Sequence, residues 1–413
     1  MSLMKFINEI NQTYSITDNN LKIQELTRLL SINPQENKYI SIIYNAKSIP
    51  SSITTLYDED WSAFNLIITS FVKLCHEMDP WSILKSFDLY AAYLNDLSIG
   101  FNNNNYGWLL SNIIQSTTSI IVPWAKNLDL MMYFKEQGGK FRLNYMASLI
   151  LKIFNNIRIN DSNLFKNSII LYLGNLLCFI YFKLDNPLLC QNVFSNMQNT
   201  SLKLKDYPIT QQLKYKYYLA KFYLIKNHLL ESFENLKWCL LNTSSLKNQR
   251  LILELLIPIS LIIGIKPNFN YLMSKGLNFE FFGLYQQIAQ VVKTGDYQSF
   301  KKIINENSQY LKDKNLLLLM NKLDILVYRN LVKKVWLLLN KPASLDYTRI
   351  PIYDHENDEL YLENLLVTLI DSNLIKGKLT MNKTVVLSKN DPFPKVFNIY
   401  QVRFAKRSLN QWM

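Results

Sequence analysis

The chain has few of the residues on which compact catalytic sites usually depend. Its 413 residues include only 10 glycines, 12 prolines, 4 cysteines and 3 histidines. The glycines are scattered and form neither a GxGxxG motif nor a P-loop, which argues against a phosphate-cradling loop. The histidines (His76, His228 and His355) include no pair at i and i+4, so they lack the familiar metal-binding spacing. We therefore expect no enzyme, no metal site and no cofactor.

The cysteines and the apolar runs indicate a reducing compartment and a chain without membrane spans. The amino-terminal segment MSLMKFINEINQ has no apolar core beside a cleavage site, so it does not read as a signal peptide. The most apolar runs, residues 169–182 and 251–265, are shorter than a bilayer span and are expected to be core helices. Free thiols are expected at the four cysteines, which show no paired spacing: Cys75, Cys178, Cys190 and Cys239.

Positive charge is in excess and gathers at the C-terminus. Lysine and arginine total 45 against 32 aspartates and glutamates, a formal net charge of +13. Residues 1–60 hold five basic and seven acidic side chains, whereas residues 371–413 hold eight basic and two acidic ones. Such an excess favours an anionic partner, which is nucleic acid, an acidic protein or a membrane surface. A generally basic protein without such a partner is the alternative.

Helical spacing dominates the chain up to residue 315. The scarcity of glycine and proline, with 49% hydrophobic residues, favours long helices around a large core. The first part is expected to hold helices in 1–30, a connection from 31 to 55, a helical pair over 60–97, and helices at 108–122 and 140–157. Short polar turns then separate regular helices, which predicts helical hairpins stacked as a solenoid. These helices are expected at 164–183, 187–197, 209–226, 228–241, 246–264, 279–293 and 296–311.

Residues 316–340 are apolar around most of a helical circumference and predict one buried central helix. At 100° per residue, Lys322, Arg329 and Lys333 lie close to one line. We expect that line to reach solvent or an anionic partner. Pro342 is expected to end the helix.

A short mixed unit follows the central helix. Asn357 or Asp358 is expected to cap a helix that runs to Ser372. Residues 374–380 and 384–389 flank a three-residue turn and predict a β-hairpin. The predicted fold is therefore an all-α, TPR-like helical-repeat solenoid that ends in a winged-helix module, with the hairpin as its wing. The expected divisions are an N-terminal helical region (1–163), helical repeats (164–315), the central helix with the winged-helix module (316–394) and a basic aromatic tail (395–413).

The predicted wing and the tail are candidates for nucleic-acid binding. Lys376 and Lys378 are two residues apart on a strand, which places them on one face, and Lys383 lies in the turn. The tail adds aromatic rings that are suited to stacking on bases: Phe397, Tyr400, Phe404 and Trp412. A solvated charged face is the alternative. The residues predicted to bind nucleic acid are Lys376, Lys378, Lys383, Lys389, Arg403, Lys406 and Arg407.

A second candidate surface lies on the helix expected at 209–226. Most of its aromatic side chains are expected to fill the core. Other side chains fall away from the apolar face, and a basic surface with exposed aromatic rings suits an acidic peptide. These side chains are Lys214, Lys216, Tyr217 and Lys221.

Six segments carry a resemblance to known proteins: EMDPWSILKSFDLY (77–90), YFKLDNPLLC (181–190), KYKYYLAKFYL (214–224), KNQRLILELLIPISLIIG (247–264), VYRNLVKKVWLLL (327–339) and SKNDPFP (388–394). Together with helical repeats that lead through a long apolar helix into a winged helix, they resemble PCI domains. More narrowly, they are similar to the PCI subunit of the second transcription-export complex, and the first segment resembles its fungal form.

The resemblance implies a non-enzymatic subunit that couples transcription to mRNA export at the periphery of the nuclear pore. It implies binding of a large scaffold subunit through the winged helix, a small acidic protein along the repeats, and RNA or DNA without strong sequence preference. Carried onto this chain, the scaffold contact involves Tyr328, Arg329, Lys333 and Trp336. The alternatives are a PCI subunit of a signalosome-like or proteasome-lid-like complex without nucleic-acid binding, a purely structural repeat scaffold, or an enzyme that uses no familiar motif.

Overall fold

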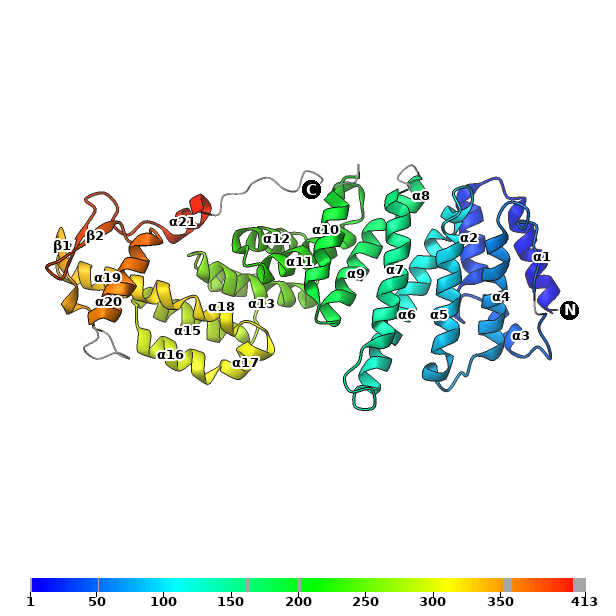
Figure 1. Cartoon of the computed structure of the whole chain (residues 1–413), viewed down its shortest axis with the longest axis horizontal. Coiled ribbons are helices and arrows are strands. Elements are labelled where there is room, and N and C mark those ends of the chain that lie inside the picture. Colours follow the sequence, from blue (N-terminus) through cyan, green and yellow to red (C-terminus); the bar gives the residue numbers. More distant parts are fainter. Residues whose placement is uncertain (1, 51, 160–162, 199–201, 352–358, 404–413) are drawn as a thin grey trace. The chain divides into compact units, whose positions relative to one another are not determined.

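The computed structural model describes residues 2–50, 52–159, 163–198, 202–351 and 359–403. The chain forms two compact units, the first up to Tyr218 and the second from Leu219 onward. Both are built from helices, and the second also holds a small antiparallel sheet near the C-terminus (Figure 1). This confirms the predicted class, a helical-repeat solenoid that ends in a winged-helix module. The four-part division of the chain stays a prediction.

The first unit is a series of helical hairpins. Its longest helices, α4 to α7, pack each against the next, and α7 also packs against α9. The helices are α1 (Ser2–Tyr14), α2 (Asn19–Leu30), α3 (Tyr39–Tyr44), α4 (Ser62–Glu77), α5 (Ile83–Gly100), α6 (Ser111–Met131), α7 (Phe141–Ile159), α8 (Leu164–Asn167), α9 (Ile170–Lys183), α10 (Cys190–Gln198) and α11 (Ile209–Ile225), which continues into the second unit, with 3-10 turns η1 (Gly107–Leu110), η2 (Pro187–Leu189) and η3 (Leu204–Asp206).

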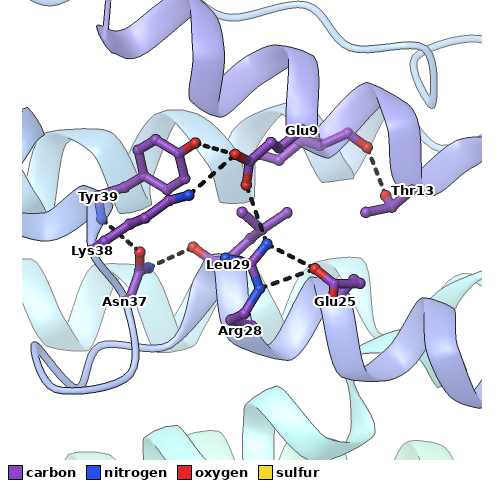
Figure 2. A network of polar contacts seen from close by, with 9 residues as sticks. Glu9, Thr13, Glu25, Arg28, Leu29, Asn37, Lys38 and Tyr39 are labelled. Carbon is purple, nitrogen blue, oxygen red and sulfur yellow. Dashed lines mark hydrogen bonds and ion pairs between the residues drawn. The ribbon is translucent and has the colours of Figure 1, made fainter.

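A polar network fixes the first three helices (Figure 2). Glu9 on α1 accepts hydrogen bonds from the Tyr39 hydroxyl at 2.5 Å and from Arg28 at 3.1 Å. Lys38 also approaches Glu9, at 3.4 Å. Burial alone raises the pKa of Glu9, but the hydrogen bonds from Tyr39, Arg28 and Lys38 outweigh it, so the pKa is lowered overall. Glu9 therefore joins α1 to α2 and to the segment that leads into α3.

The second unit continues the repeats and adds the terminal module. Its elements are α12 (Leu229–Leu241), α13 (Leu246–Ile262), α14 (Phe269–Ser274), α15 (Phe281–Thr294), α16 (Tyr297–Glu306), α17 (Ser308–Asp313), α18 (Leu317–Asn321), α19 (Asp324–Leu338), β1 (Ser344–Asp346), the 3-10 turn η4 (Tyr347–Arg349), α20 (Glu359–Asp371), β2 (Gly377–Thr380), β3 (Thr384–Leu387) and α21 (Val396–Arg403).

The predicted single central helix is wrong, because the chain breaks between α18 and α19. The backbone N–H groups of Lys322 and Leu323 bond three residues back, to Leu319 and Met320, which tightens the turn. Asp324 then opens α19 and accepts an ion pair from Lys301 at 2.8 Å. A carboxylate in the first turn stabilises the start of a helix through the helix dipole. The ion pair from Lys301 on α16 thus supports the start of α19. The apolar pattern of the sequence does not predict this contact.

Several other expected segments differ in detail. The connection at 31–55 contains the helix α3, and α6 continues through Pro123 to Met131. The helices expected at 164–183 and 296–311 are each divided in two, α8 with α9 and α16 with α17. The residues predicted to cap α20, Asn357 and Asp358, lie outside the described residues.

The sheet of the terminal module has the order β1-β3-β2, with both pairings antiparallel. The predicted hairpin is confirmed, since β2 and β3 flank the turn from Met381 to Lys383. The strand β1 was not predicted, and it places Leu345 opposite Val385. Both side chains are buried, as is Leu366 on α20. The hairpin is therefore held by a third strand and a helix, which makes the wing part of a packed module.

The stretch Leu164–Lys183 is long and apolar enough to cross a membrane, but 67% of it is buried inside the chain. It corresponds to α8 and α9, and its apolar side chains fill the core of the first unit, as the sequence predicts. All four cysteines are buried free thiols. Burial raises the pKa of Cys75 to about 12, so this thiol stays protonated and unreactive at neutral pH.

Candidate nucleic-acid interface

Arg329 on α19 joins the helical repeats to the winged-helix module. Its side chain is 6% exposed and donates to the carbonyl oxygens of Leu374 at 3.2 Å and Pro394 at 2.6 Å. The guanidinium also donates to the Asn330 side chain, which in turn donates to the carbonyl of Val292 on α15. Burial lowers the pKa of Arg329. One buried cation therefore satisfies carbonyl groups at both edges of the hairpin region and links them to the repeats.

This geometry corrects the predicted basic line. Lys322 is exposed and Lys333 half-buried, but Arg329 between them is turned inward. The cause is the terminal module, which packs over this part of α19 and supplies the two carbonyl groups. The line therefore offers no continuous charged edge to solvent or to a partner.

The residues predicted to contact a scaffold partner divide into two pairs. Tyr328 and Arg329 are buried, and the Tyr328 ring stacks on Tyr297 with centroids 4.4 Å apart. Lys333 and Trp336 are half-buried. The Trp336 indole donates to the carbonyl of Pro342 at 3.0 Å. Of the four, only the second pair presents surface to a partner in this conformation, and the first pair supports it from inside.

The wing carries four exposed lysines. Lys378 lies on β2 opposite Val386, on the side of the strand that faces solvent. Lys376 precedes β2 on the same side and is fixed by two backbone hydrogen bonds, from its N–H to Pro392 and from Ser388 to its carbonyl. Lys383 occupies the left-handed region in the turn, with φ 55°. Lys389 follows β3. Within the described part of the chain, Lys376, Lys378 and Lys389 form no ion pair.

One carboxylate lies near the tip of the wing. Asp346 on β1 accepts hydrogen bonds from the hydroxyl and the backbone N–H of Thr348, at 2.7 and 3.0 Å. These two hydrogen bonds lower its pKa, and the charges of Arg349 and Lys383 lower it further. The field of Lys383 thus reaches Asp346, but the other wing lysines extend away from any paired acid, so the exposed face of β2 is positive.

The predicted tail is partly a helix. The helix α21 begins against Gly264 at the end of α13, where an added Cβ would lie 2.5 Å from the Cβ of Val396. Phe397 and Tyr400 are half-buried in this helix, and burial raises the pKa of Tyr400. Arg403 ends the helix and is exposed. The remaining predicted tail residues lie outside the described residues: Phe404, Lys406, Arg407 and Trp412.

The second candidate surface lies on α11. Lys214 is exposed, whereas Lys216, Tyr217 and Lys221 are half-buried. The ring of Tyr217 contacts that of Tyr218, with centroids 5.9 Å apart. The same helix buries Tyr215, Leu219 and Ala220. Core packing and an accessible basic edge are therefore both present on one helix, as the sequence allows.

Among the described residues, no three His, Cys, Asp or Glu side chains lie close enough together to bind a metal ion. Sequence reasoning missed the inward role of Arg329. The carbonyl that accepts from the guanidinium belongs to Pro394, far along the chain, so the sequence around Arg329 carries no local signal of this contact.

Comparison with known proteins places this architecture. No family model matches the chain. It is 27% identical over 409 residues to the PCI domain-containing protein 2 homolog of Dictyostelium discoideum, covering 94% of this chain and 86% of that protein. It is 26% identical over 304 residues to PCI domain-containing protein 2 of Xenopus laevis, covering 71% of this chain and 74% of that one. The chain is thus similar to PCI domain-containing proteins over most of its length.

The chain is also similar to the nuclear mRNA export protein THP1 of Saccharomyces cerevisiae. The two are 27% identical over 388 residues, which cover 81% of this chain and 85% of THP1. Each of these two alignments covers more of the chain than either compact unit holds, so the similarity extends into both units.

Proposed function

We propose that this PCI protein is a non-enzymatic adaptor subunit of a nuclear complex that couples transcription to mRNA export. The observation that carries the proposal is the similarity to a nuclear mRNA export protein across both units. The structure is compatible with it, because helical repeats and a packed winged-helix module are surfaces for binding other chains. In this proposal the protein works at the nuclear pore periphery and performs no chemistry of its own.

The wing is the proposed contact with RNA or DNA. Lys378 lies on β2, Lys376 directly before it and Lys383 in the turn, and a third strand and α20 support this hairpin, so the three charges are held on a rigid element. Lysines bind phosphate as point charges and read no bases, which fits binding without sequence preference. If about four phosphates of a single strand are neutralised, affinity falls roughly fiftyfold between about 50 and 200 mM salt.

Two protein partners complete the proposal. A large scaffold subunit binds the terminal module beside Lys333 and Trp336, where Leu337 and Leu338 extend the apolar surface with 45% and 73% exposure. Exposed leucines next to a half-buried tryptophan are typical of an interface. A small acidic protein binds the basic edge of α11 around Lys214.

The test determines the subunits of the purified complex and measures its binding to RNA. The tagged protein is purified gently and its stoichiometric partners are identified by mass spectrometry. RNA binding of the eluted assembly is then followed by fluorescence anisotropy against salt. We expect a large scaffold chain, a small acidic chain and binding that weakens steeply with salt.

A variant with Lys376, Lys378 and Lys383 changed to glutamate localises the binding. Its control changes Lys266, Lys293 and Lys302, which are exposed lysines of the same unit, and alters the net charge equally. The wing variant should lose RNA binding and the control should keep most of it. Equal loss in the two variants would show that overall charge, and not the wing, attracts RNA.

A second candidate function is membership of a signalosome-like complex without nucleic-acid binding. The chain is 28% identical over 234 residues to a CSN12 homolog of Schizosaccharomyces pombe, which covers 54% of this chain. This match covers less of the chain than the one to THP1. Signalosome subunits in the purified assembly, with no RNA binding, would favour this second candidate.

A further inference from the structure

The turn between α6 and α7 exposes large apolar side chains. Phe134 is 92% exposed, Met131 78% and Phe141 65%. Leu130, Tyr133 and Tyr145 are exposed beside them. In Figure 1 this turn lies at one end of the hairpin formed by α6 and α7. Single exposed apolar residues are common, but a group within one turn marks a binding surface.

The turn is held in one conformation by ion pairs. Arg142 at the start of α7 bonds Glu136 through two nitrogens, each at 2.9 Å, and Asp129 at 3.2 Å. Asp129 also accepts the backbone N–H of Leu143 at 2.9 Å, which caps α7. Lys140 donates to Asp185 at 2.5 Å. The aromatic side chains therefore stand on a rigid base, so a partner would bind them at little cost in ordering the turn.

The exposed surface continues along α7. Phe141, Tyr145, Ser148 and Lys152 are all exposed, at spacings of four, three and four residues, so they form one line on the helix. At 1.5 Å per residue this line is about 16 Å long, which is three turns of a helix. It begins with two aromatic rings and ends with a lysine. A partner with an apolar end and an acidic end matches this order.

The charged side chains on this surface indicate whether its partner is acidic or basic. Its carboxylates are all engaged, Asp129 and Glu136 with Arg142 and Asp185 with Lys140. Lys135, next to Phe134, and Lys152 are exposed. We propose that the α6–α7 turn and the adjoining line on α7 bind an acidic amphipathic helix of about three turns from another protein. This proposal is independent of the nucleic-acid and scaffold contacts proposed for the terminal module.

A helix fits this surface better than a membrane does. The apolar side chains lie on the turn and then along one side of α7, so they form an elongated strip. An amphipathic helix presents residues at i, i+3, i+4 and i+7, which can follow the strip along its length.

The test uses a synthetic peptide and the full chain. The peptide has 14 residues, leucine at i, i+3, i+4 and i+7, glutamate elsewhere and a fluorescein label. A second peptide carries lysine in place of glutamate, and a third has the acidic composition scrambled so that no apolar face remains. Anisotropy should show that the acidic amphipathic peptide binds at least tenfold more tightly than either of the others. Equal binding of the three peptides would overturn the proposal.

Variants then locate the site. Changing Phe134 and Phe141 to serine should weaken binding of the acidic peptide at least tenfold, and Lys152→Glu should weaken it severalfold. The matched control is Leu164→Ser, which removes an apolar side chain of 82% exposure elsewhere in the first unit and should leave binding unchanged. Circular dichroism checks that each variant is folded.

Three results would overturn the proposal. The first is unchanged peptide binding by the folded Phe134 and Phe141 variant. The second is binding to vesicles of anionic lipid that this variant loses while the peptide remains unbound. The third is self-association of the protein, seen by sedimentation, that this variant abolishes, since that would assign the surface to a second copy of the chain.

Discussion

Replacing Lys166 with methionine tests a buried charge that has no carboxylate partner among the residues that the structure describes. The side chain is 1% exposed, and its ammonium group donates to the carbonyl oxygens of Phe101 at 2.6 Å and Asn103 at 3.0 Å. Phe101 follows α5, so its carbonyl is one that the helix leaves without a partner. The cation also lies 4.6 Å from the Phe101 ring centroid and at the negative end of the helix dipole. Lys166 thus caps α5 from α8.

The expected effect follows from the pKa. Burial lowers the pKa of Lys166 from 10.5 to about 8. Between these two values the unfolded state binds more protons than the folded state, so stability rises with pH in this window. Integrating the difference from pH 7 to pH 10 gives a gain of about 2 to 3 kcal/mol for the lysine form. Methionine has no proton to lose, so the variant lacks this gain.

The assay is urea unfolding of the first unit at pH 7, 8, 9 and 10, followed by tryptophan fluorescence. The quantity compared is the unfolding free energy of the wild type minus that of Lys166→Met, which cancels the titration of tyrosines and thiols common to both. We expect this difference to grow by about 2 to 3 kcal/mol across the series. Lys152→Met, at an exposed lysine of the same unit, should give a difference that is nearly independent of pH. A flat difference for Lys166→Met would mean that the ammonium group is solvated, and the reasoning would fail.

Three further predictions concern other buried contacts. Arg329→Met removes the donor to the carbonyl groups of Leu374 and Pro394 and should destabilise the terminal module by about 2 to 4 kcal/mol. Hydrogen exchange of the amides in β2 and β3 measures this loss of stability. Lys333→Met is the control. Glu9→Gln should cost about 1 kcal/mol at pH 7. Because the folded pKa is lowered, that cost should begin to shrink as the pH falls below the ordinary value of 4.5 and should disappear once the pH is below the folded pKa. Melting curves against pH, with exposed Glu77→Gln as the control, would contradict this if the cost did not decrease on acidification. Gly264→Ala should destabilise the protein by roughly 1 to 3 kcal/mol more than Gly276→Ala does. Both glycines have positive φ, but only an added Cβ at Gly264 would press against Val396. Equal unfolding midpoints for the two variants would refute a tight contact between α21 and Gly264.

The sequence predicted the elements whose signals are local. The hairpin follows from alternating residues around the turn at Met381 to Lys383, and most repeat helices follow from their apolar spacing. The strand β1 is only three residues long, which is too short for a recognisable alternating pattern. It forms a strand because it pairs with β3. The break before α19 likewise depends on the contact between Lys301 and Asp324. Such elements are set by partners distant in the sequence, so local patterns do not reveal them.

The sequence predicts which side chains of the candidate site face solvent only where the local structure decides it. Alternation along the predicted strand places Lys376 and Lys378 on the solvent side, and Lys383 and Lys389 are exposed because they lie in the turn and after β3. Arg329 lies on a helix whose angular position the sequence gives correctly. Which neighbour covers that side of the helix depends on where the chain returns after α20, and the sequence carries no local signal of it.

The two contacts that hold the terminal module also bear on how it would bind a partner. Arg329 fixes the segments at Leu374 and Pro394, on either side of the hairpin, and α21 packs back against Gly264 of the repeats. The lysines of the wing are therefore held at defined positions relative to α13 and α19, within one compact unit. A partner that binds beside Trp336 would therefore meet a preformed charged face. If the wing binds nucleic acid as proposed, loss of the Arg329 contacts should weaken that binding even though Arg329 is itself buried.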